Sequence, residues 1–143
     1  MDISTFFKDR TILPEEGVWL IIIKVPVDIN RTIAEQIDHI YKYSSMSDCN
    51  ITMAKMYGFK DVESFIGVRL GDLLPPTPFN LEYLSNFISN HYKITDAVSK
   101  EIDLDGKPLY FSNSLEGIFN ADEQLIGAAG IQRDITDTYR REI

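Results

Sequence analysis

The sequence predicts an α+β fold in which one antiparallel sheet carries helices on a single face. Three observations support this prediction. A short, β-branched apolar run at residues 18–25 indicates a buried strand. Helical patterns follow it, and beyond residue 94 apolar residues recur at every second position, which is the period of strands. Because strands and helices are segregated along the chain, we expect the natural pocket between the sheet and the helices.

The first strand and the helix after it have clear boundaries. Gly17 and Pro26 flank the apolar run VWLIIIKV, and both residue types are unfavourable inside a strand. Thr32 and Glu35 have the spacing of a capping box, in which each side chain bonds the other residue's backbone N–H. Apolar residues then recur at helical intervals, so we expect an amphipathic helix near 32–44. The segment SMSDCN after it is the predicted second strand.

Two short helices are predicted from matching boundary residues. Asn50 and Asp61 are residue types that cap helix N-termini by accepting a backbone N–H. Gly58 and Gly67 follow them and readily adopt the left-handed conformation in which helices end. The prolines of LGDLLPPTP then predict a loop.

A longer helix is predicted from Asn80 to about His91. Its apolar residues recur at intervals of three and four, so one face of the helix is expected to be buried. The expected buried residues are Leu81, Leu84, Phe87 and Ile88.

The rest of the chain predicts three antiparallel strands joined by hairpins. Asp105-Gly106 is a strong hairpin signal, and a second polar turn occupies residues 120–124. The expected strands are residues 94–104, 108–119 and 125–135.

Composition limits the classes of function. A chain of 143 residues is long enough to form one domain with its own core. Its net charge of −8 argues against nucleic-acid binding and direct contact with anionic membranes, because both need clustered lysine and arginine. The single cysteine, Cys49, excludes an internal disulfide, and no secretory signal or long apolar span occurs. We therefore expect a cytoplasmic domain in which Cys49 is a small buried residue.

The order of the elements and three motifs together resemble a PAS domain, the sensory fold of bacterial signalling proteins. The motifs are NITMAKMYGFKDVESFIG, the hairpin DGKPLYFSNSLEGI and the ending GIQRDITD. The resemblance covers residues 17–137, with the helix near 32–44 as an insertion where such domains usually have a tight turn. We expect residues 1–16 to form an N-terminal extension, with a short helix that covers the outer sheet face or a partner subunit.

The resemblance implies a sensory role without catalysis. Such a domain senses a small molecule, forms a homodimer, or does both, and acts on a covalently linked output domain. That output domain would be a histidine kinase, a diguanylate cyclase or a transcription regulator. Asp134, Ile135 and Thr136 match the family's D-I-T signature and would transmit the signal. Residues 138–143 have the composition of a helix start, and we expect them to begin a truncated helical linker.

The last three strands supply the candidate ligand-binding residues. Alternate residues of a strand share a face, and resemblance to flavin-binding PAS domains implies that Glu101, Asn113 and Gln132 face one cavity. Unpaired buried polar groups cost about 1–3 kcal/mol each, so these three imply a ligand, bound water or mutual hydrogen bonds. Phe111, in the middle row, and Tyr57, from the helices, complete the candidate set.

Two small residues on the last strand, Ala128 and Gly130, leave space on the same face. That space would form a cavity, or it would admit the close approach of Tyr57 or Phe87 from the helices. The cofactor is unknown from sequence.

Particular cofactors are constrained by the resemblance. Flavin-binding photosensors of the family place a reactive cysteine three residues after the glycine matching Gly67, where this chain has Leu70. The covalent flavin adduct is therefore excluded. The haem-ligand position of the family matches Leu84, and His91 sits at a helix C-terminus, where it favours the helix dipole. No cluster has metal-ligand spacing, so no metal is expected.

Two alternatives to ligand sensing stay open. One is a pure dimerisation module with a filled core. The other is a small cone-fold enzyme that uses Glu101 or Asp96 as a base whose pKa is raised by burial. No paired carboxylates, phosphate-binding loop or nucleophile with a base occurs in the sequence, so we expect no catalytic residues.

Overall fold

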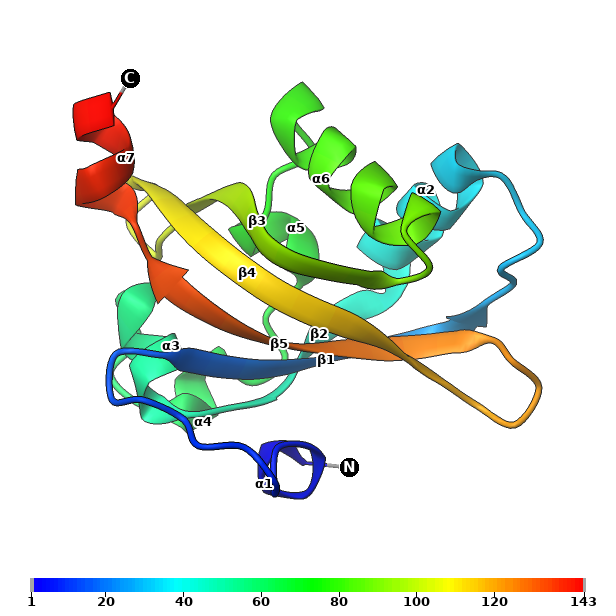
Figure 1. Cartoon of the computed structure of the whole chain (residues 1–143), viewed down its shortest axis with the longest axis horizontal. Helices are drawn as coiled ribbons and strands as arrows, with labels where there is room; N and C mark the ends of the chain where they lie inside the picture. Colours follow the sequence, from blue (N-terminus) through cyan, green and yellow to red (C-terminus); the bar gives the residue numbers. More distant parts are fainter. Residues whose placement is uncertain (1, 143) are drawn as a thin grey trace.

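Five antiparallel strands form one sheet in the order β2-β1-β5-β4-β3 (Figure 1). The computed structural model describes residues 2–142. Strand β1 pairs with β5, so the two ends of the domain meet in the middle of the sheet. The strands are β1 (Gly17–Val27), β2 (Ser44–Cys49), β3 (Lys93–Ile102), β4 (Pro108–Phe119) and β5 (Leu125–Asp134). The predicted α+β class is confirmed, as are the order and pairing of the last three strands.

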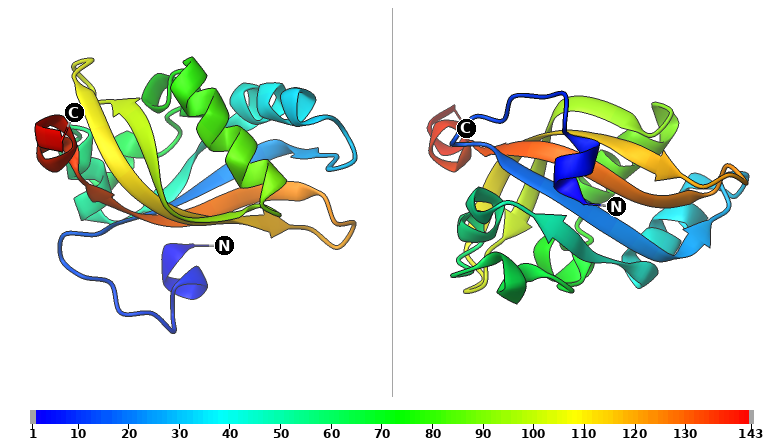
Figure 2. Two further views of the ribbon diagram at one scale, coloured as in Figure 1. Left: turned by 45° about the horizontal axis from the view of Figure 1, so that its top comes forward. Right: turned by 90° about the horizontal axis from the view of Figure 1, so that it is seen from below.

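Helices α2 to α6 pack on one face of the sheet, and the N-terminal helix α1 lies on the other (Figure 2). Helix α7 follows β5 at the end of the described chain (Figure 1). Helix α5 lies in a stretch predicted to be a loop; it is only four residues long and ends before the two prolines. The helices are α1 (Ile3–Phe6), α2 (Ile33–Tyr43), α3 (Ile51–Met56), α4 (Val62–Phe65), α5 (Leu70–Leu73), α6 (Pro78–Ser89) and α7 (Thr136–Glu142).

The predicted starts of α2, α3 and α4 are confirmed by their hydrogen bonds, whereas α6 begins at Pro78, two residues before the predicted Asn80. Thr32 and Glu35 form a capping box, in which each side chain accepts the other's backbone N–H at 3.2 Å. Asn50 and Asp61 each accept a backbone N–H from the first turn of α3 and α4, at 2.9 and 2.7 Å. These bonds satisfy donors that have no partner inside the helix. The start of α2 is therefore determined by residues within its own first turn.

The buried face of α6 differs from the prediction at its start. The side chain of Leu81 is 37% exposed, whereas Asn80 is fully buried. The Asn80 amide donates to the Lys100 carbonyl at 2.6 Å and accepts the Lys100 N–H at 3.0 Å. Because β3 is an edge strand, this amide pairs with a backbone that has no neighbouring strand. The prediction counted apolar residues only, and it therefore placed Leu81 where a paired asparagine lies.

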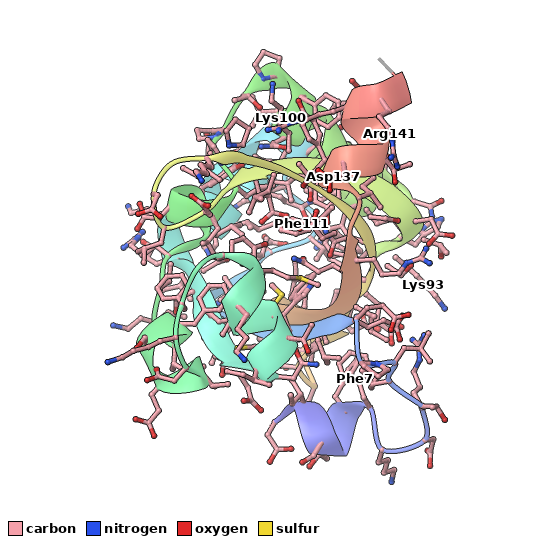
Figure 3. The ribbon with its side chains drawn as sticks, turned by 90° about the vertical axis from the view of Figure 1, so that its left-hand side faces the viewer. Phe7, Lys93, Lys100, Phe111, Asp137 and Arg141 are labelled. Carbon is pink, nitrogen blue, oxygen red and sulfur yellow. The ribbon has the colours of Figure 1, made fainter. Side chains whose placement is uncertain are left out.

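The N-terminal residues cover part of the outer face of the sheet. Ile3 donates its backbone N–H to the Asp48 carboxylate at 2.8 Å, which ties α1 to β2. Phe7 packs in a second apolar cluster with residues of β1 and β5, among them Leu20 and Ile131. Figure 3 shows Phe7 between α1 and the sheet, and Phe111 inside the domain. Of the two places expected for this segment, the structure shows the outer sheet face.

One further finding concerns the reactivity of Cys49, and another concerns membrane-spanning helices. Cys49 is buried in β2, and burial raises the pKa of its thiol to about 12, so the thiol stays protonated and unreactive at neutral pH. Among residues 2–142, no helix is both long enough and apolar enough to cross a membrane.

Candidate functional site

The inward-facing residues of β3, β4 and β5 form the polar part of the interior. Asn113 in β4 lies opposite Ala97 in β3 and opposite Gln132 in β5. Because side chains alternate along a strand, this register turns Ser99 and Glu101 of β3 to the same face. All four polar residues are buried, with exposed fractions of 6% or less. The structure therefore brings Glu101, Asn113 and Gln132 to one face, as the sequence predicted.

The Glu101 carboxylate accepts one hydrogen bond at each oxygen. The Tyr57 hydroxyl donates to Oε1 at 2.5 Å, and the Ser99 hydroxyl donates to Oε2 at 2.6 Å. Tyr57 comes from the end of α3, where Gly58 has a positive φ of 89° that turns the chain away from the helix. Helix α3 and strand β3 are thus joined through a single buried carboxylate.

Two donor chains converge on that carboxylate. In one, the Trp19 indole donates to the Asn113 carbonyl at 3.0 Å, and the Asn113 amide donates to Ser99 at 3.1 Å. In the other, the Gln132 amide donates to the Tyr57 hydroxyl at 3.1 Å. The polar groups are therefore paired with one another across β1, β4, β3, α3 and β5. Mutual pairing was one of the possibilities that the sequence left open.

Burial dominates the electrostatics of this network. It raises the pKa of Glu101 to about 7, although the bonds from Ser99 and Tyr57 act in the opposite direction. Burial also raises the pKa of Tyr57 and of Tyr83 well above the ordinary value, and the nearby Glu101 carboxylate raises both further. Among the described residues, the ion pairs are Arg31–Glu35 and Arg133–Asp96, so no cation balances Glu101. The carboxyl group therefore titrates near neutral pH.

A cavity of about 60 Å³ adjoins the network between the sheet and the helices. Most of its walls are aliphatic and aromatic side chains from β1, α2, α5 and α6, and one end is polar. Four of the five candidate ligand-binding residues line the cavity: Tyr57, Glu101, Asn113 and Gln132. Phe111 is fully buried and is not among the lining residues; its ring packs on Tyr57 with 5.1 Å between centroids. Phe111 therefore supports Tyr57 and does not face the cavity.

Trp19 and Tyr83 also line the cavity but were not among the candidates. The Trp19 ring lies over Gly130, where an added Cβ would be 2.4 Å from Cζ2. Gly130 thus leaves room for the Trp19 ring from β1. The expectation was that Tyr57 or Phe87 would approach from the helices, and at Gly130 it was wrong. The sequence could have indicated that Tyr83 is buried, because it lies three residues after Asn80 and four before Phe87, on the same face of α6. The Trp19 contact depends on β1 pairing with β5, which no local pattern indicates.

The cavity does not fit the cofactors considered above. Leu70 and Leu84 both line it, with aliphatic side chains at the positions considered for a flavin adduct and a haem ligand. A cavity of about 150 Å³ holds one benzene ring, so 60 Å³ is too small for a three-ring flavin or a haem. Neither histidine is among the lining residues. Within residues 2–142, no group of three or more His, Cys, Asp or Glu side chains has a metal-binding arrangement.

One candidate base lies away from the cavity. Asp96 is exposed and has a positive φ of 51°, in the irregular part of β3 between Ile94 and Ala97. Its carboxylate is 3.8 Å from the Arg133 guanidinium. The alternative that uses Asp96 as a buried base is therefore wrong, because Asp96 precedes the inward-facing Ala97 and its side chain lies on the opposite, exposed side of the strand.

The end of β5 is tied to the neighbouring strand β4. The Ile135 N–H donates to the Tyr110 carbonyl at 2.9 Å, and the Tyr110 N–H donates to the Thr136 hydroxyl at 3.0 Å. The Asp134 carboxylate accepts the Thr136 N–H at 2.9 Å, which caps the start of α7. The Tyr139 ring then stacks on Tyr110, with 4.3 Å between centroids and 18° between planes. Helix α7 is thus docked on β4 through residues only a few positions from Gln132.

The sheet order, the helices on one face and the cavity between them are those of an α+β fold of the PAS type. The family model described as PAS domain matches residues 40–137, which is more than half of the chain. The protein therefore belongs to the PAS domain family. The match begins near the end of α2, so most of that helix lies before it.

Comparison with solved structures shows the same fold. The PAS domain of a protein from Colwellia psychrerythraea has a TM-score of 0.58 and 19% identity, with 94% of each chain covered. The LOV domain of a blue-light activated histidine kinase from Erythrobacter litoralis has a TM-score of 0.55 and 18% identity, covering 87% of this chain and 99% of that one. The PAS domain of the fruit-fly ELK potassium channel has a TM-score of 0.53 and 12% identity, with 94% of each chain covered. No curated protein matches the chain.

Proposed function

We propose that this PAS domain senses a small molecule in its interior cavity and transmits occupancy through β5 to α7. PAS domains are sensory modules and are not generally enzymes themselves. The observation that carries the proposal is that one strand, β5, runs from the cavity to the start of α7. Gln132 lines the cavity and bonds to Tyr57, and it lies two residues before Asp134 on the same strand.

The proposed mechanism is a shift between two positions of α7. A ligand that contacts Gln132 or Glu101 changes the hydrogen bonds that hold the last strand in register. Docking of α7 depends on a few contacts with Tyr110. A small change at β5 therefore alters the fraction of molecules in which α7 is docked. The ligand drives this shift only as far as its affinity differs between the two positions. Asp134, Ile135 and Thr136 are the proposed transmission residues.

The proposal includes partners beyond the ligand. The domain would act on a covalently linked output domain, namely a histidine kinase, a diguanylate cyclase or a transcription regulator, and it would form a homodimer. Support for the output domain comes from one of the structural neighbours, the LOV domain of a blue-light activated histidine kinase.

Native mass spectrometry of the gently purified domain, compared with its denatured mass, tests the proposal first. Retained small molecules, or compounds that raise Tm in a metabolite screen, should also change hydrogen exchange in α7. Ala128→Val fills the cavity from β5. It should abolish both ligand binding and the change in hydrogen exchange of α7, while the fold persists. Exposed Thr138→Val is the matched control and should retain them. If no compound binds the unaltered domain, sensing is wrong and the pure dimerisation module becomes the better account.

A further inference from the structure

The polar end of the cavity has an unusual charge pattern. Glu101 is the only charged side chain among the described residues that line the cavity, so its charge meets no lysine, arginine or histidine there. A buried carboxylate without a counter-ion either keeps its proton or receives a cation from outside the protein. Anionic ligands are disfavoured here, because they would place a second negative charge beside Glu101 in a low-dielectric interior.

The unused hydrogen-bonding capacity consists mainly of acceptors. Each Glu101 oxygen accepts one bond in the protein, whereas a carboxylate offers about four acceptor positions. Gln132 uses its amide nitrogen for Tyr57 and Met56, which leaves its carbonyl oxygen available as an acceptor. Tyr83 in the same lining carries a hydroxyl group that can both accept and donate. A primary ammonium group presents three N–H donors and no acceptor, so its chemistry complements this set.

The aromatic lining favours the same kind of ligand. The rings of Trp19, Tyr83 and Phe87 line the cavity together with aliphatic side chains. Aromatic faces attract cations, and the attraction is stronger where the site is shielded from water. The aliphatic walls in turn accommodate a short hydrocarbon tail. Because about 150 Å³ holds the six carbons of benzene, 60 Å³ holds about two or three heavy atoms, which restricts the tail to about one or two carbons.

We infer that the cavity binds a short primary alkylammonium ion, with its nitrogen against Glu101 and its chain among the apolar side chains. This inference rests on the proposed sensing function and names the chemical class of the ligand. Binding pairs the ammonium with the ionised carboxylate, so a protonated Glu101 must first release its proton to solvent.

Proton release gives the inference a characteristic pH dependence. The titratable groups that act on Glu101 are Tyr57 from the end of α3, Tyr83 from α6 and Tyr41 from α2, and burial raises the pKa of all three. The three tyrosines therefore stay neutral, and of these four groups it is Glu101 that titrates between pH 6 and 8. Alkylammonium affinity should rise about tenfold over that interval, because the ionised fraction of a group with a pKa near 7 rises by about that factor.

Binding of ethylammonium chloride, ethanol and sodium acetate to the whole 143-residue chain tests the inference. Affinities are measured by calorimetry or thermal shift at pH 6 and pH 8 and at constant ionic strength. We expect ethylammonium to bind at least tenfold more tightly than ethanol at pH 8, and acetate to have no effect. Glu101→Gln should remove the preference for the ammonium and its pH dependence. Glu116→Gln, at an exposed carboxylate on β4, is the control and should keep both.

The outcomes separate this inference from the proposed function. Equal binding of ethanol and ethylammonium, or a preference that survives in Glu101→Gln, overturns the ammonium inference and leaves sensing in place. Binding of acetate alone overturns it as well. If none of the three probes binds and the metabolite screen also finds no ligand, the proposed sensing function fails together with it.

Discussion

At Glu101, a carboxylate lies inside the protein with two hydroxyl donors and, among residues 2–141, no cation paired with it. Removing a carboxylate from water disfavours its charged form, and the bonds from Tyr57 and Ser99 offset only part of that cost. The pKa therefore stays raised, at about 7. A group of this kind adds or loses a charge near physiological pH, which gives the site two electrostatic states.

The pH dependence of stability should report this group directly. In the unfolded chain the Glu101 carboxyl releases its proton near pH 4.5, whereas in the folded protein it does so at about pH 7. Between these values the folded state binds the extra proton, so the free energy of unfolding falls as the pH rises. The contribution is fully present below pH 4.5 and is lost above pH 7. From the difference in pKa it amounts to about 3 kcal/mol.

Glu101→Gln should remove this slope and leave the protein folded. Urea unfolding followed by the fluorescence of Trp19, the single tryptophan, measures the free energy at several pH values. Glu116→Gln, which changes an exposed carboxylate, should keep the slope of the unaltered protein. Identical slopes in the two variants would show that Glu101 has an ordinary pKa.

Gly130 is a second position where one side chain decides the packing. An added Cβ would lie 2.4 Å from Trp19 Cζ2, which is far closer than a van der Waals contact. Gly130→Ala should therefore displace the indole and cost about 1–3 kcal/mol, the usual range for overpacking a core. Gly71→Ala is the matched control, since its added Cβ would meet Tyr41 at an ordinary 3.8 Å. Near-ultraviolet circular dichroism and urea unfolding measure both effects, and equal stabilities would contradict this account of Trp19.

At the scale of elements, α7 is held by a small number of contacts. The Thr136 hydroxyl accepts the Tyr110 N–H at 3.0 Å, and the Tyr139 ring stacks on Tyr110. Arg140 adds a bond of 3.4 Å to the Pro108 carbonyl. The side chains of α7 are half-buried or exposed through residue 141, so little apolar area holds the helix in place. An element secured in this way opens more easily than the sheet beneath it.

Thr136→Val should loosen α7 without unfolding the sheet. The variant loses the hydroxyl that bonds Tyr110 and leaves that N–H without its partner, at a cost of about 1 kcal/mol. Hydrogen exchange of the α7 amides should then accelerate about fivefold, while exchange in β5 stays as it is. Thr138→Val, two residues along the same helix at an exposed position, is the control. Unchanged exchange in Thr136→Val would remove this residue from the proposed transmission path.

Local patterns predicted most elements and missed those determined by long-range pairing. The caps at Thr32, Asn50 and Asp61 depend on bonds within one helical turn, so they could be recognised from sequence. The burial of Asn80 depends on the free edge of β3, twenty residues away, and an apolar count cannot show it. Helix α5 is a single turn, which is too short to produce a periodic pattern.

At the scale of the whole molecule, the candidate site could be predicted as far as strand period and hairpin register allow. Those two features determine that Glu101, Asn113 and Gln132 share a face. They do not determine which of these residues meets a cavity and which meets another side chain. Phe111 lies on the inward face of β4 but packs against Tyr57 and does not line the cavity. Trp19 comes from a strand more than a hundred residues before Gly130, which it contacts.

The sheet has apolar surface on both faces, and its outer face is only partly covered. Phe7 and its neighbours from the N-terminal segment cover Val18 and Leu20. The next outward residue of β1, Ile22, is 50% exposed. In register it lies beside Gly127, which has no side chain, and Ile118 follows on the other side of that glycine. Ile22, Gly127 and Ile118 therefore form an apolar strip across β1, β5 and β4, which we call the outer strip.

The proposed homodimer should use the outer strip, because a second copy would bury the same apolar residues on both sides. Sedimentation velocity over a concentration series should show a dimer that Ile22→Ser weakens at least tenfold. Leu104→Ser changes an even more exposed leucine, 62% exposed, beside the β3–β4 turn and should leave the dimer intact. Equal weakening by both variants would indicate nonspecific association through apolar groups. A monomer at every concentration would remove the homodimer and would leave ligand sensing to act within a single copy of the domain.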